Sequence, residues 1–378
     1  MPLYLDDDQE TLADTVRPFM AEKAPVSHLR DLRDADDPAG FSRDLWRQFG
    51  EMGFTGVLVD EADGGLGMGH VEAGIVLEEI GRALTPSPFI GSAIGAVEAL
   101  RGADAALREA WLPGIVAGET VAALALDEAA RHRPQRVALK AERQGNGFRL
   151  TGTKQFVPFG HEADLLIVSA RTAGDVADED GVTLFALPRS QSGVSISAER
   201  LADSSFAARV ELDGVELDGS AVIGEVDGGR SVLGRVLDAV RTGAASEMVG
   251  VAEGASAMTL DYIKQRKQFG RVIGSYQALQ HRAAHLYAEM EVARAATLKA
   301  QQSLDAGSAE AARDASVAKA MAGIASGLAV REGVQMHGGI GMTDEYDIGF
   351  FMKRQRVLAE LYGDTDFHAD LLARMEGY

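Results

Sequence analysis

The stretch RVALKAERQGNGFRLTGTKQFV (136–157) decides the fold class, because it predicts two β-strands joined by a turn at Asn146-Gly147. Further short β-like runs, separated by Gly, Pro, Asp and Ser, follow at 164–171, 181–188 and 209–218. The spacing leaves no room for helices between these runs. The sequence therefore predicts an antiparallel barrel or sandwich and excludes repeated βαβ units.

Helical patterns flank this β segment on both sides. Apolar residues recur at intervals of three and four in FSRDLWRQFGEMGF (41–54) and VEAGIVLEEIGRAL (71–84). Beyond the β segment, the chain predicts long helices near 231–267, 275–304 and 310–336. These helices are rich in Ala and weakly amphipathic, so we expect much of their surface to be buried, some of it between subunits. The predicted α+β protein has an N-terminal helical domain, a middle β-barrel or sandwich domain and a C-terminal helical bundle, with boundaries at 1–118, 119–230 and 231–378.

Composition narrows the classes of function. The 378 residues carry a net charge of −20 and include no Cys, so disulfides and thiol nucleophiles are excluded and nucleic acid or anionic membrane is disfavoured as a partner. No apolar run reaches the roughly 18 residues that span a bilayer, and the acidic N-terminus is unlike a signal peptide. These features predict a cytoplasmic protein that binds an anionic ligand only where basic residues gather.

Two stretches have the chemistry of a phosphate site. Arg266, Lys267 and Arg271 form a basic cluster beside a Phe-Gly helix end, just before a new helix N-terminus near Gly274. In QMHGGIGMTDEY (335–346), a Gly-Gly pair ends a helix and leaves backbone N–H groups bare. On spacing alone, a solvated helix end is the more frequent explanation of the first stretch, and an ordinary helix cap is the more frequent explanation of the second.

Neither a Rossmann site nor a metal site is predicted. The glycine-rich loop at 60–69 lacks the GxGxxG spacing, since His70 stands where the third Gly is needed. His281 and His285 are four residues apart, but Arg282 occupies the position at which a zinc motif has Glu.

The stretch DAVRTGAASEMVG (238–250) combines small residues with three charges. Small residues allow another backbone or a flat ligand to approach closely. Asp238 and Arg241 are three apart and can pair on one helix face. Glu247 has Ala, Ser, Met and Val as neighbours, and a carboxylate in such surroundings needs a partner or acquires a raised pKa. Glu247 is therefore a candidate general base as well as a candidate ion-pair partner.

In this order, RKQFGR, QALQH and QMHGGIGMT resemble motifs of the acyl-CoA dehydrogenase family of flavoenzymes, and the likeness covers essentially the whole chain. The resemblance implies three domains, FAD bound between the β domain and the bundle, and dimers usually paired into tetramers. It implies α,β-dehydrogenation of an acyl-CoA thioester, as in fatty acid β-oxidation and lipid metabolism. A carboxylate takes the α-proton, the β-hydride goes to the flavin, and electrons pass to an electron-transfer flavoprotein.

The resemblance also implies roles for individual residues. Arg266 matches the arginine on the FAD pyrophosphate, Phe269 the phenylalanine beside the adenine part, and Gln277 the polar residue that follows. Gln335, Gly338 and Gly339 match the segment that reaches the FAD of a partner subunit. Asp238 and Arg241 match the pair that line the acyl-CoA channel.

The catalytic base departs from the family pattern. Family members carry it as Glu in Tyr-Glu-Gly-Thr near the C-terminus, and here the matching positions in ELYGDTDF (360–367) are Tyr362 or Gly363. Others place Glu immediately before the channel arginine, which is Val240 here. Glu247, seven residues or nearly two turns further along, is the first candidate for the base, and Asp364 is the second.

The flavin-binding pattern of the β domain is also eroded. The family loop that touches flavin and substrate is reduced to ALDEAARHR (125–133). Phe156 replaces a Trp on the flavin, and Pro158 replaces a Thr and has no N–H to donate.

Three interpretations follow from the resemblance and these departures. The first is an FAD-dependent dehydrogenase that uses Glu247. The second is a non-catalytic or FAD-poor subunit of a heteromeric acyl-CoA dehydrogenase, and the third is a flavin oxidase or monooxygenase on the same fold. The family's heteromeric members act on steroid side-chain thioesters, so we expect a bulky acyl group and a homotetramer or heterotetramer.

Overall fold

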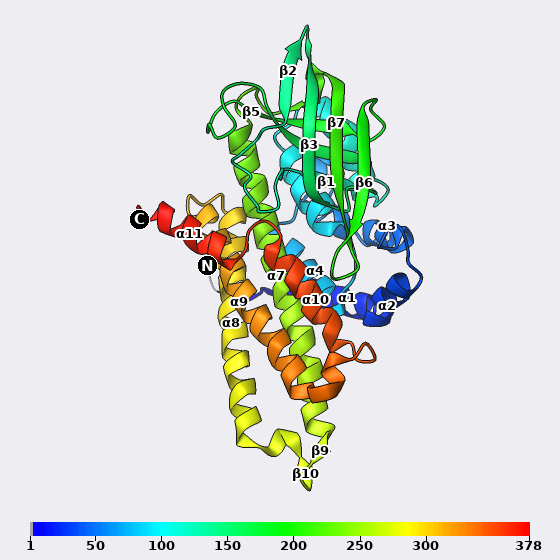
Figure 1. Cartoon of the computed structure of the whole chain (residues 1–378), viewed down its shortest axis with the longest axis vertical. Helices are drawn as coiled ribbons and strands as arrows, with labels where there is room; N and C mark the ends of the chain where they lie inside the picture. The colour runs from blue at the N-terminus through cyan, green and yellow to red at the C-terminus, as the bar shows by residue number, and fades with distance from the viewer. Residues whose placement is uncertain (1–2) are drawn as a thin grey trace. The chain divides into compact units, whose positions relative to one another are not determined.

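The computed structural model describes residues 3–378, which form two compact units (Figure 1). The helical unit comprises the chain up to Asp34, His70–Thr85 and Arg241–Tyr378. The sheet unit comprises Ala35–Gly69 and Pro86–Val240. Each unit therefore combines segments that are distant in sequence, and the boundary between them falls within helix α7 (Gly229–Gln265).

The helical unit confirms the three long helices predicted from the sequence, each to within two residues at its ends. Its helices are α1 (Asp7–Lys23), α2 (Val26–Asp34), α4 (His70–Ala83), most of α7, α8 (Gln277–Asp305), α9 (Ala311–His337), α10 (Ile348–Glu360) and α11 (Thr365–Met375). A hairpin of β9 (Lys267–Gln268) and β10 (Arg271–Val272) and the short turn η5 (Ile273–Ser275) connect α7 to α8, and η6 (Gly338–Met342) follows α9.

Small residues of α7 bring its backbone against that of α4. A Cβ built on Gly250 would lie 1.9 Å from the Glu78 carbonyl oxygen, and one built on Gly81 would lie 2.1 Å from the Glu247 carbonyl oxygen. Both distances are far below van der Waals contact, so glycine is required at each position. The small residues in this part of α7 therefore serve helix packing.

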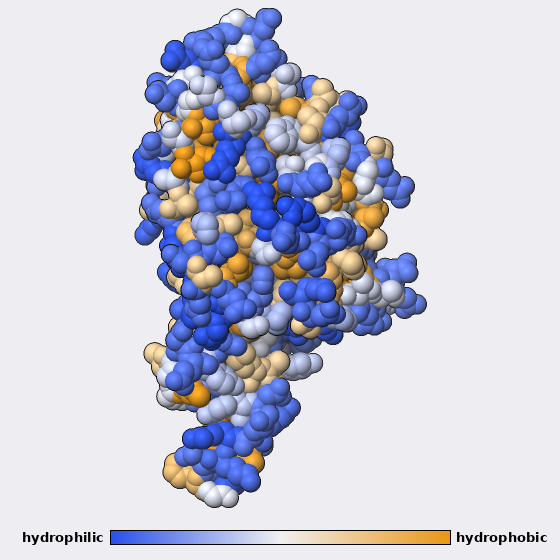
Figure 2. Space-filling view, turned by 90° about the vertical axis from the view of Figure 1, so that its right-hand side faces the viewer, coloured by the Kyte–Doolittle hydropathy of each residue, from blue (hydrophilic) through white to orange (hydrophobic). Residues whose placement is uncertain are grey.

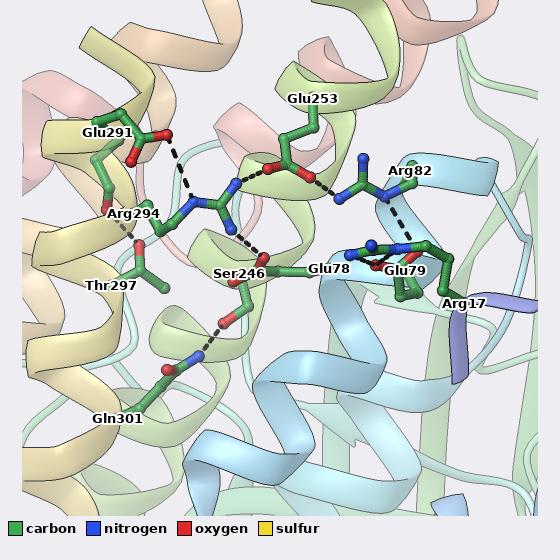
Figure 3. A network of polar contacts seen from close by, with 11 residues as sticks. Arg17, Glu78, Glu79, Arg82, Ser246, Glu253, Glu291, Arg294, Thr297 and Gln301 are labelled. Carbon is green, nitrogen blue, oxygen red and sulfur yellow. Dashed lines mark hydrogen bonds and ion pairs between the residues drawn. The ribbon is translucent and has the colours of Figure 1, made fainter. Parts of the chain in front are cut away.

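Charged side chains tie four helices of the helical unit together (Figure 3). Arg294 of α8 pairs with Glu78 of α4 at 2.7 Å and with Glu253 of α7, which also pairs with Arg82. Glu79 accepts from Arg82 and from Arg17 of α1, each at 3.0 Å. Burial raises the pKa of the Glu79 carboxyl, and its hydrogen bond to Arg17 opposes this shift. Such networks fix register between helices, since a charge left without its partner in this interior is costly.

The sheet unit holds an eight-stranded sheet flanked by short helices. Its helices are α3 (Arg43–Glu51), η1 (Phe54–Gly56), η2 (Glu61–Asp63), η3 (Ile90–Ala96), α5 (Val97–Leu100), α6 (Ala105–Val116) and η4 (Gly219–Ala221). The strands are β1 (Ala122–Ala125), β2 (Lys140–Gln144), β3 (Gly147–Pro158), β4 (Leu165–Arg171), β5 (Val182–Pro188), β6 (Val194–Arg200), β7 (Phe206–Asp218) and β8 (Val222–Ile223).

The strands follow the order β6-β7-β3-β2-β4-β5-β8, with β1 beside β4. Pairing is antiparallel, as predicted, except that β4 runs parallel to β1 and to a single residue of β2. The predicted hairpin joins β2 to β3, but Gln144 pairs with Gly147, so its two turn residues are Gly145 and Asn146. Gly145 takes a positive φ of 57°, which glycine adopts without strain.

Burial in the sheet follows the pattern of each strand. Strand β4 is buried at all seven positions, as expected for a continuous apolar run, while much of β7 alternates between buried and exposed side chains. An aromatic cluster of Trp46, Phe49 and Phe89 packs in the helices of the same unit, with ring centroids 6.0 and 6.3 Å from Trp46.

The surface is mixed in polarity. On the face drawn in Figure 2, hydrophobic residues lie in groups among hydrophilic ones. None of the helices within residues 3–378 combines the length and apolar character needed to cross a bilayer.

Candidate active site

Arg241 lies on α7 against the loop that joins α10 to α11. The residue is 6% exposed; its Nε donates to the Tyr362 carbonyl oxygen at 3.3 Å, and its guanidinium lies 5.5 Å from the centroid of the Phe367 ring. Asp238 stands three residues earlier on the same helix and is half-buried. The structure thus places the predicted channel arginine beside the stretch that matches the family's catalytic loop.

Neither of the two positions that match the missing base, Tyr362 and Gly363, carries a carboxylate. Tyr362 and Gly363 both have left-handed backbones, with φ values of 59° and 106°. A Cβ on Gly363 would lie 2.4 Å from Cδ1 of Phe367 and 3.0 Å from Nε2 of His368. The Phe367 ring therefore fills the space that a side chain at residue 363 would enter, and the backbone disfavours any residue other than glycine.

Asp364, the second candidate for the base, caps helix α11. Its Oδ1 accepts a hydrogen bond from the Phe367 N–H at 2.7 Å, and its backbone is extended, as is usual for an N-cap residue. The carboxylate thus satisfies one of the unpaired N–H groups that begin the helix.

Glu247, the first candidate, is paired with Arg354 of α10. The Nε and Nη2 atoms of Arg354 donate to one carboxylate oxygen, Oε1, at 2.7 and 2.6 Å. The Glu247 side chain is 3% exposed, and the Arg354 side chain is 14% exposed. This ion pair provides the partner that a buried carboxylate needs, and it holds Glu247 toward α10. Sequence reasoning did not identify Arg354, because nothing distinguishes it there from Lys353 and Arg356.

Sequence reasoning also missed Lys319 of α9. The residue is 1% exposed, and its Nζ donates to the carbonyl oxygens of Gly363 at 2.8 Å and Ala359 at 3.1 Å. Burial, and to a lesser degree the positive charge of Arg241, lower the pKa of Lys319 to about 7. A signal was present in the sequence, since Lys319 is the one charged residue between Asp314 and Arg331.

The predicted phosphate-binding residues between α7 and α8 are exposed. Arg266 ends α7, Gln277 begins α8, and Phe269 at the tip of the β9–β10 hairpin is 92% exposed. Phe269 and Gly270 both have positive φ, as the two central residues of a tight hairpin turn require. Arg271 stacks on the Tyr276 ring at 3.9 Å. Within residues 3–378, Arg266 has no carboxylate partner, which leaves its guanidinium open to an anionic ligand.

The Gly-Gly turn follows α9 in the same unit. Gly338 has a φ of 65°, its N–H donates to the carbonyl oxygen of Gln335, and a Cβ on either Gly338 or Gly339 would meet no atom within 4 Å. Gln335 and both glycines are exposed. His337, just before them, stacks on Tyr262 of α7 with ring centroids 4.5 Å apart. Since Tyr262 precedes Arg266 by about one turn, this contact places the basic helix end near the Gly-Gly turn.

In the sheet unit, a β-bulge interrupts the pairing of β3 with β7 between Lys154 and Val157. Phe156 lies in this bulge with a positive φ of 52° and is half-buried, as is Pro158. Bulges of this kind redirect side chains at functional sites. Because Phe156 lies in the bulge, its aromatic ring does not follow the regular alternation of side chains along β3.

The loop before β2 is fastened to this bulge. Lys154 is fully buried and pairs with Glu128 at 2.6 Å, and the Gln155 N–H donates to the carbonyl oxygen of Asp127 at 2.8 Å. Asp127 in turn holds His132, with 2.8 Å between Oδ2 and Nδ1. The shortened loop at 125–133 is therefore an ordered structure of its own.

The residues of the two units differ in how well they fit FAD. In the helical unit, Arg266, the exposed Phe269 and the open Gly338–Gly339 turn offer a cation, an aromatic ring and uncovered backbone, which suit a dinucleotide. In the sheet unit, Phe156 offers an aromatic surface, but Pro158 offers no backbone donor. No cluster of three or more metal-ligating side chains occurs among residues 3–378.

Family models match nearly the whole chain. The N-terminal domain of acyl-CoA dehydrogenase matches residues 6–119, the middle domain 128–215 and the C-terminal domain 227–376. The chain belongs to the acyl-CoA dehydrogenase family of oxidoreductases, and its fold is the acyl-CoA dehydrogenase fold.

Individual relatives agree with this assignment. The chain is 30% identical to a mitochondrial isovaleryl-CoA dehydrogenase of Solanum tuberosum, over 98% of this chain and 91% of the relative. Its structure resembles a variant of the Tcur3481–Tcur3483 steroid ACAD, with a TM-score of 0.88, 29% identity and 98% of both chains covered. It also resembles the ChsE4–ChsE5 complex of Mycobacterium tuberculosis, with a TM-score of 0.90, 25% identity and all of both chains covered.

Proposed function

We propose that this chain is a subunit of an FAD-dependent acyl-CoA dehydrogenase in which a second, similar subunit supplies the carboxylate base. The observation that carries the proposal is that the two positions matching the family base, Tyr362 and Gly363, hold no carboxylate. At residue 363 the φ is 106°, and a Cβ would lie 2.4 Å from the Phe367 ring, so the backbone and packing disfavour a side chain there.

The geometry of the other two carboxylates supports the same proposal. A general base must reach the substrate proton, and its pKa must approach that of its task. Glu247 already receives two N–H groups from Arg354 on its Oε1 atom, so this oxygen is engaged in an ion pair. Asp364 is committed to the N-terminus of α11.

In this proposal the chain contributes binding groups to the assembly. The acyl-CoA channel is lined by Asp238 and Arg241. The FAD of the assembly is contacted by a larger set of residues from both units, namely Arg266, Phe269, Gln277, Gln335, Gly338, Gly339, Phe156 and Pro158. FAD supplies the acceptor for the β-hydride of an acyl-CoA thioester, and electrons then pass to an electron-transfer flavoprotein. Two structural relatives are named as a steroid enzyme or a two-protein complex, which supports a bulky, steroid-like acyl group and a heterotetramer. The cytoplasmic location stays a prediction.

The experiment compares the chain alone with the chain co-expressed with candidate partner subunits of the same family. The visible spectrum reports bound flavin, and anaerobic addition of an acyl-CoA reports bleaching. We expect bleaching only from the assembly, and we expect Gly363→Ala in this chain to leave the bleaching of the assembly less affected than loss of the partner's carboxylate.

A self-sufficient dehydrogenase with Glu247 as base is the second candidate, favoured by the 2% exposure of that residue. It predicts flavin and bleaching in the chain alone, with bleaching lost and flavin retained in Glu247→Gln. Bleaching by the purified single chain would therefore replace the first proposal by the second.

A further inference from the structure

Two buried basic side chains converge on the loop between α10 and α11, and both donate to backbone carbonyl oxygens. Lys319 donates to the carbonyl oxygens of Ala359 and Gly363, and Arg241 donates to that of Tyr362. Three carbonyl oxygens, one in the last turn of α10 and two in the loop that follows it, are therefore held from two helices, α9 and α7. Within residues 3–378, Lys319 forms no ion pair, so its amino group serves these two carbonyls.

The loop needs such support, because its backbone is unfavourable in isolation. Tyr362 has a φ of 59°, which costs a non-glycine residue on the order of 1 kcal/mol or more. This conformation turns successive carbonyl groups toward the helix bundle. The loop leads into α11, whose N-cap is Asp364 and whose Phe367 ring lies against the Arg241 guanidinium.

We propose that Lys319 is a positioning residue of the acyl-CoA site, which fixes the loop 359–364 and through it the guanidinium of Arg241. The proposal rests on the proposed function in that it takes Arg241 as a channel residue. Lys319 itself touches only backbone, so it acts on the substrate through Arg241 and the loop.

Charge distribution around Lys319 makes this role sensitive to pH. The groups that act on its Nζ are Arg241 of α7, which opposes a positive charge, and Asp364 and Glu360 of the loop and α10, which favour one. Burial outweighs the two carboxylates and brings the pKa of Lys319 to about 7. Below that pH a second cation forms beside Arg241 in a buried site, and displacement of the loop is the route that relieves the repulsion.

The test measures the binding of octanoyl-CoA and of cyclohexanecarboxyl-CoA to the FAD-loaded assembly from pH 6 to pH 9. Lys319→Met keeps the length of the side chain and removes the donor, whereas Lys319→Gln keeps a donor. Lys299→Met on α8, where the native side chain is 52% exposed, is the matched control. Hydrogen exchange of the amides in 359–364 is followed in parallel.

We expect Lys319→Met to weaken binding about tenfold or more and to speed exchange in the loop, because the buried carbonyl group of Gly363 and the half-buried one of Ala359 lose their donor. Lys319→Gln restores part of the affinity, and Lys299→Met changes nothing. The wild-type affinity falls as the pH drops below about 7, the pKa of Lys319, and this inflection disappears in Lys319→Met.

Two results distinguish a failure of the proposed function from a failure of the positioning role of Lys319. If the wild-type assembly binds neither acyl-CoA at any pH, the proposed function is wrong. If it binds them and Lys319→Met lowers only thermal stability, with the affinity and its pH profile unchanged, Lys319 is a structural residue and the positioning role is overturned.

Discussion

Removal of one partner from the Glu247–Arg354 pair should cost the protein far more stability than a surface ion pair is worth. The two side chains are 3% and 14% exposed, and two N–H groups of Arg354 meet one oxygen of Glu247. Breaking a buried pair of this kind leaves an uncompensated charge and costs about 3–5 kcal/mol. We therefore expect Glu247→Gln and Arg354→Gln each to lower the free energy of unfolding by that order.

The double variant provides the sharper measurement. Glu247→Gln combined with Arg354→Gln removes both charges and restores a neutral pair of similar size. Its loss of stability should be smaller than the sum of the two single losses by at least about 1 kcal/mol, since residues in direct contact couple. Urea unfolding of all four proteins closes the cycle.

A control pair lies on the same helix. Arg356 and Glu360 of α10 pair at 2.9 Å with side chains 72% and 47% exposed. Arg356→Gln should cost only about 0.3–0.5 kcal/mol, as is typical of exposed pairs four residues apart. The interpretation of Glu247 as a structural partner is refuted if Glu247→Gln and Arg354→Gln are no more costly than this control. It is refuted equally if Glu247→Gln retains full stability and flavin but abolishes bleaching.

Four further outcomes are expected. Gly363→Glu should lower stability by about 1–3 kcal/mol in urea and should not create bleaching in the chain alone, because the backbone is left-handed and Phe367 fills the space. Asp364→Ala should cost about 1 kcal/mol through the lost cap of α11 while flavin reduction in the assembly persists. Gly250→Ala should lower the unfolding free energy by about 1–3 kcal/mol, since its Cβ would meet the backbone of α4 at 1.9 Å. Between pH 7 and 10.5 the unfolded chain binds a proton at Lys319 that the folded chain lacks, so the free energy of unfolding rises with pH by up to about 1.4 kcal/mol per pH unit. Lys319→Met should remove that slope when urea unfolding is measured across this pH range.

Local patterns allowed most of the elements to be predicted from the sequence. The periodicity of the apolar residues predicted α3 and α4, and the Ala-rich sequence beyond the β segment predicted the three long helices. Short β-like runs separated by turn residues predicted the β2–β3 hairpin, β4, β5 and β7. These features depend on near neighbours in the chain. Strand β6, with mostly exposed side chains, and the parallel pairing of β1 with β4 have no such local signal.

The interleaving of the two units was not predictable for the same reason. The segment His70–Thr85 belongs with the C-terminal helices, while Ala35–Gly69 belongs with the sheet. Contacts between residues far apart in the chain decide this, such as the pairing of Glu78 with Arg294 and the approach of Gly250 to the backbone of α4.

In the candidate site, too, local motifs were predictable and contacts between distant parts of the chain were not. The motifs located Arg241, Arg266 and the Gly-Gly turn by resemblance, and the departure at Gly363 was visible in the sequence. What the sequence did not contain was the partner of each buried charge. Glu247 among small residues predicts either a base or an ion pair, and only the placement of α10 brings Arg354 to it.

The most direct test of the proposed division of labour measures α-proton abstraction without hydride transfer. An acyl-CoA is incubated in D2O with the purified chain, with the partner-containing assembly and with assembly carrying Glu247→Gln in this chain, and the loss of α-protons is followed by NMR. We predict that the chain alone exchanges no α-proton above the buffer rate, and that the assembly exchanges it at the same rate with or without Glu247→Gln. Exchange catalysed by the chain alone and abolished by Glu247→Gln would contradict this account, because it would place the base within this chain.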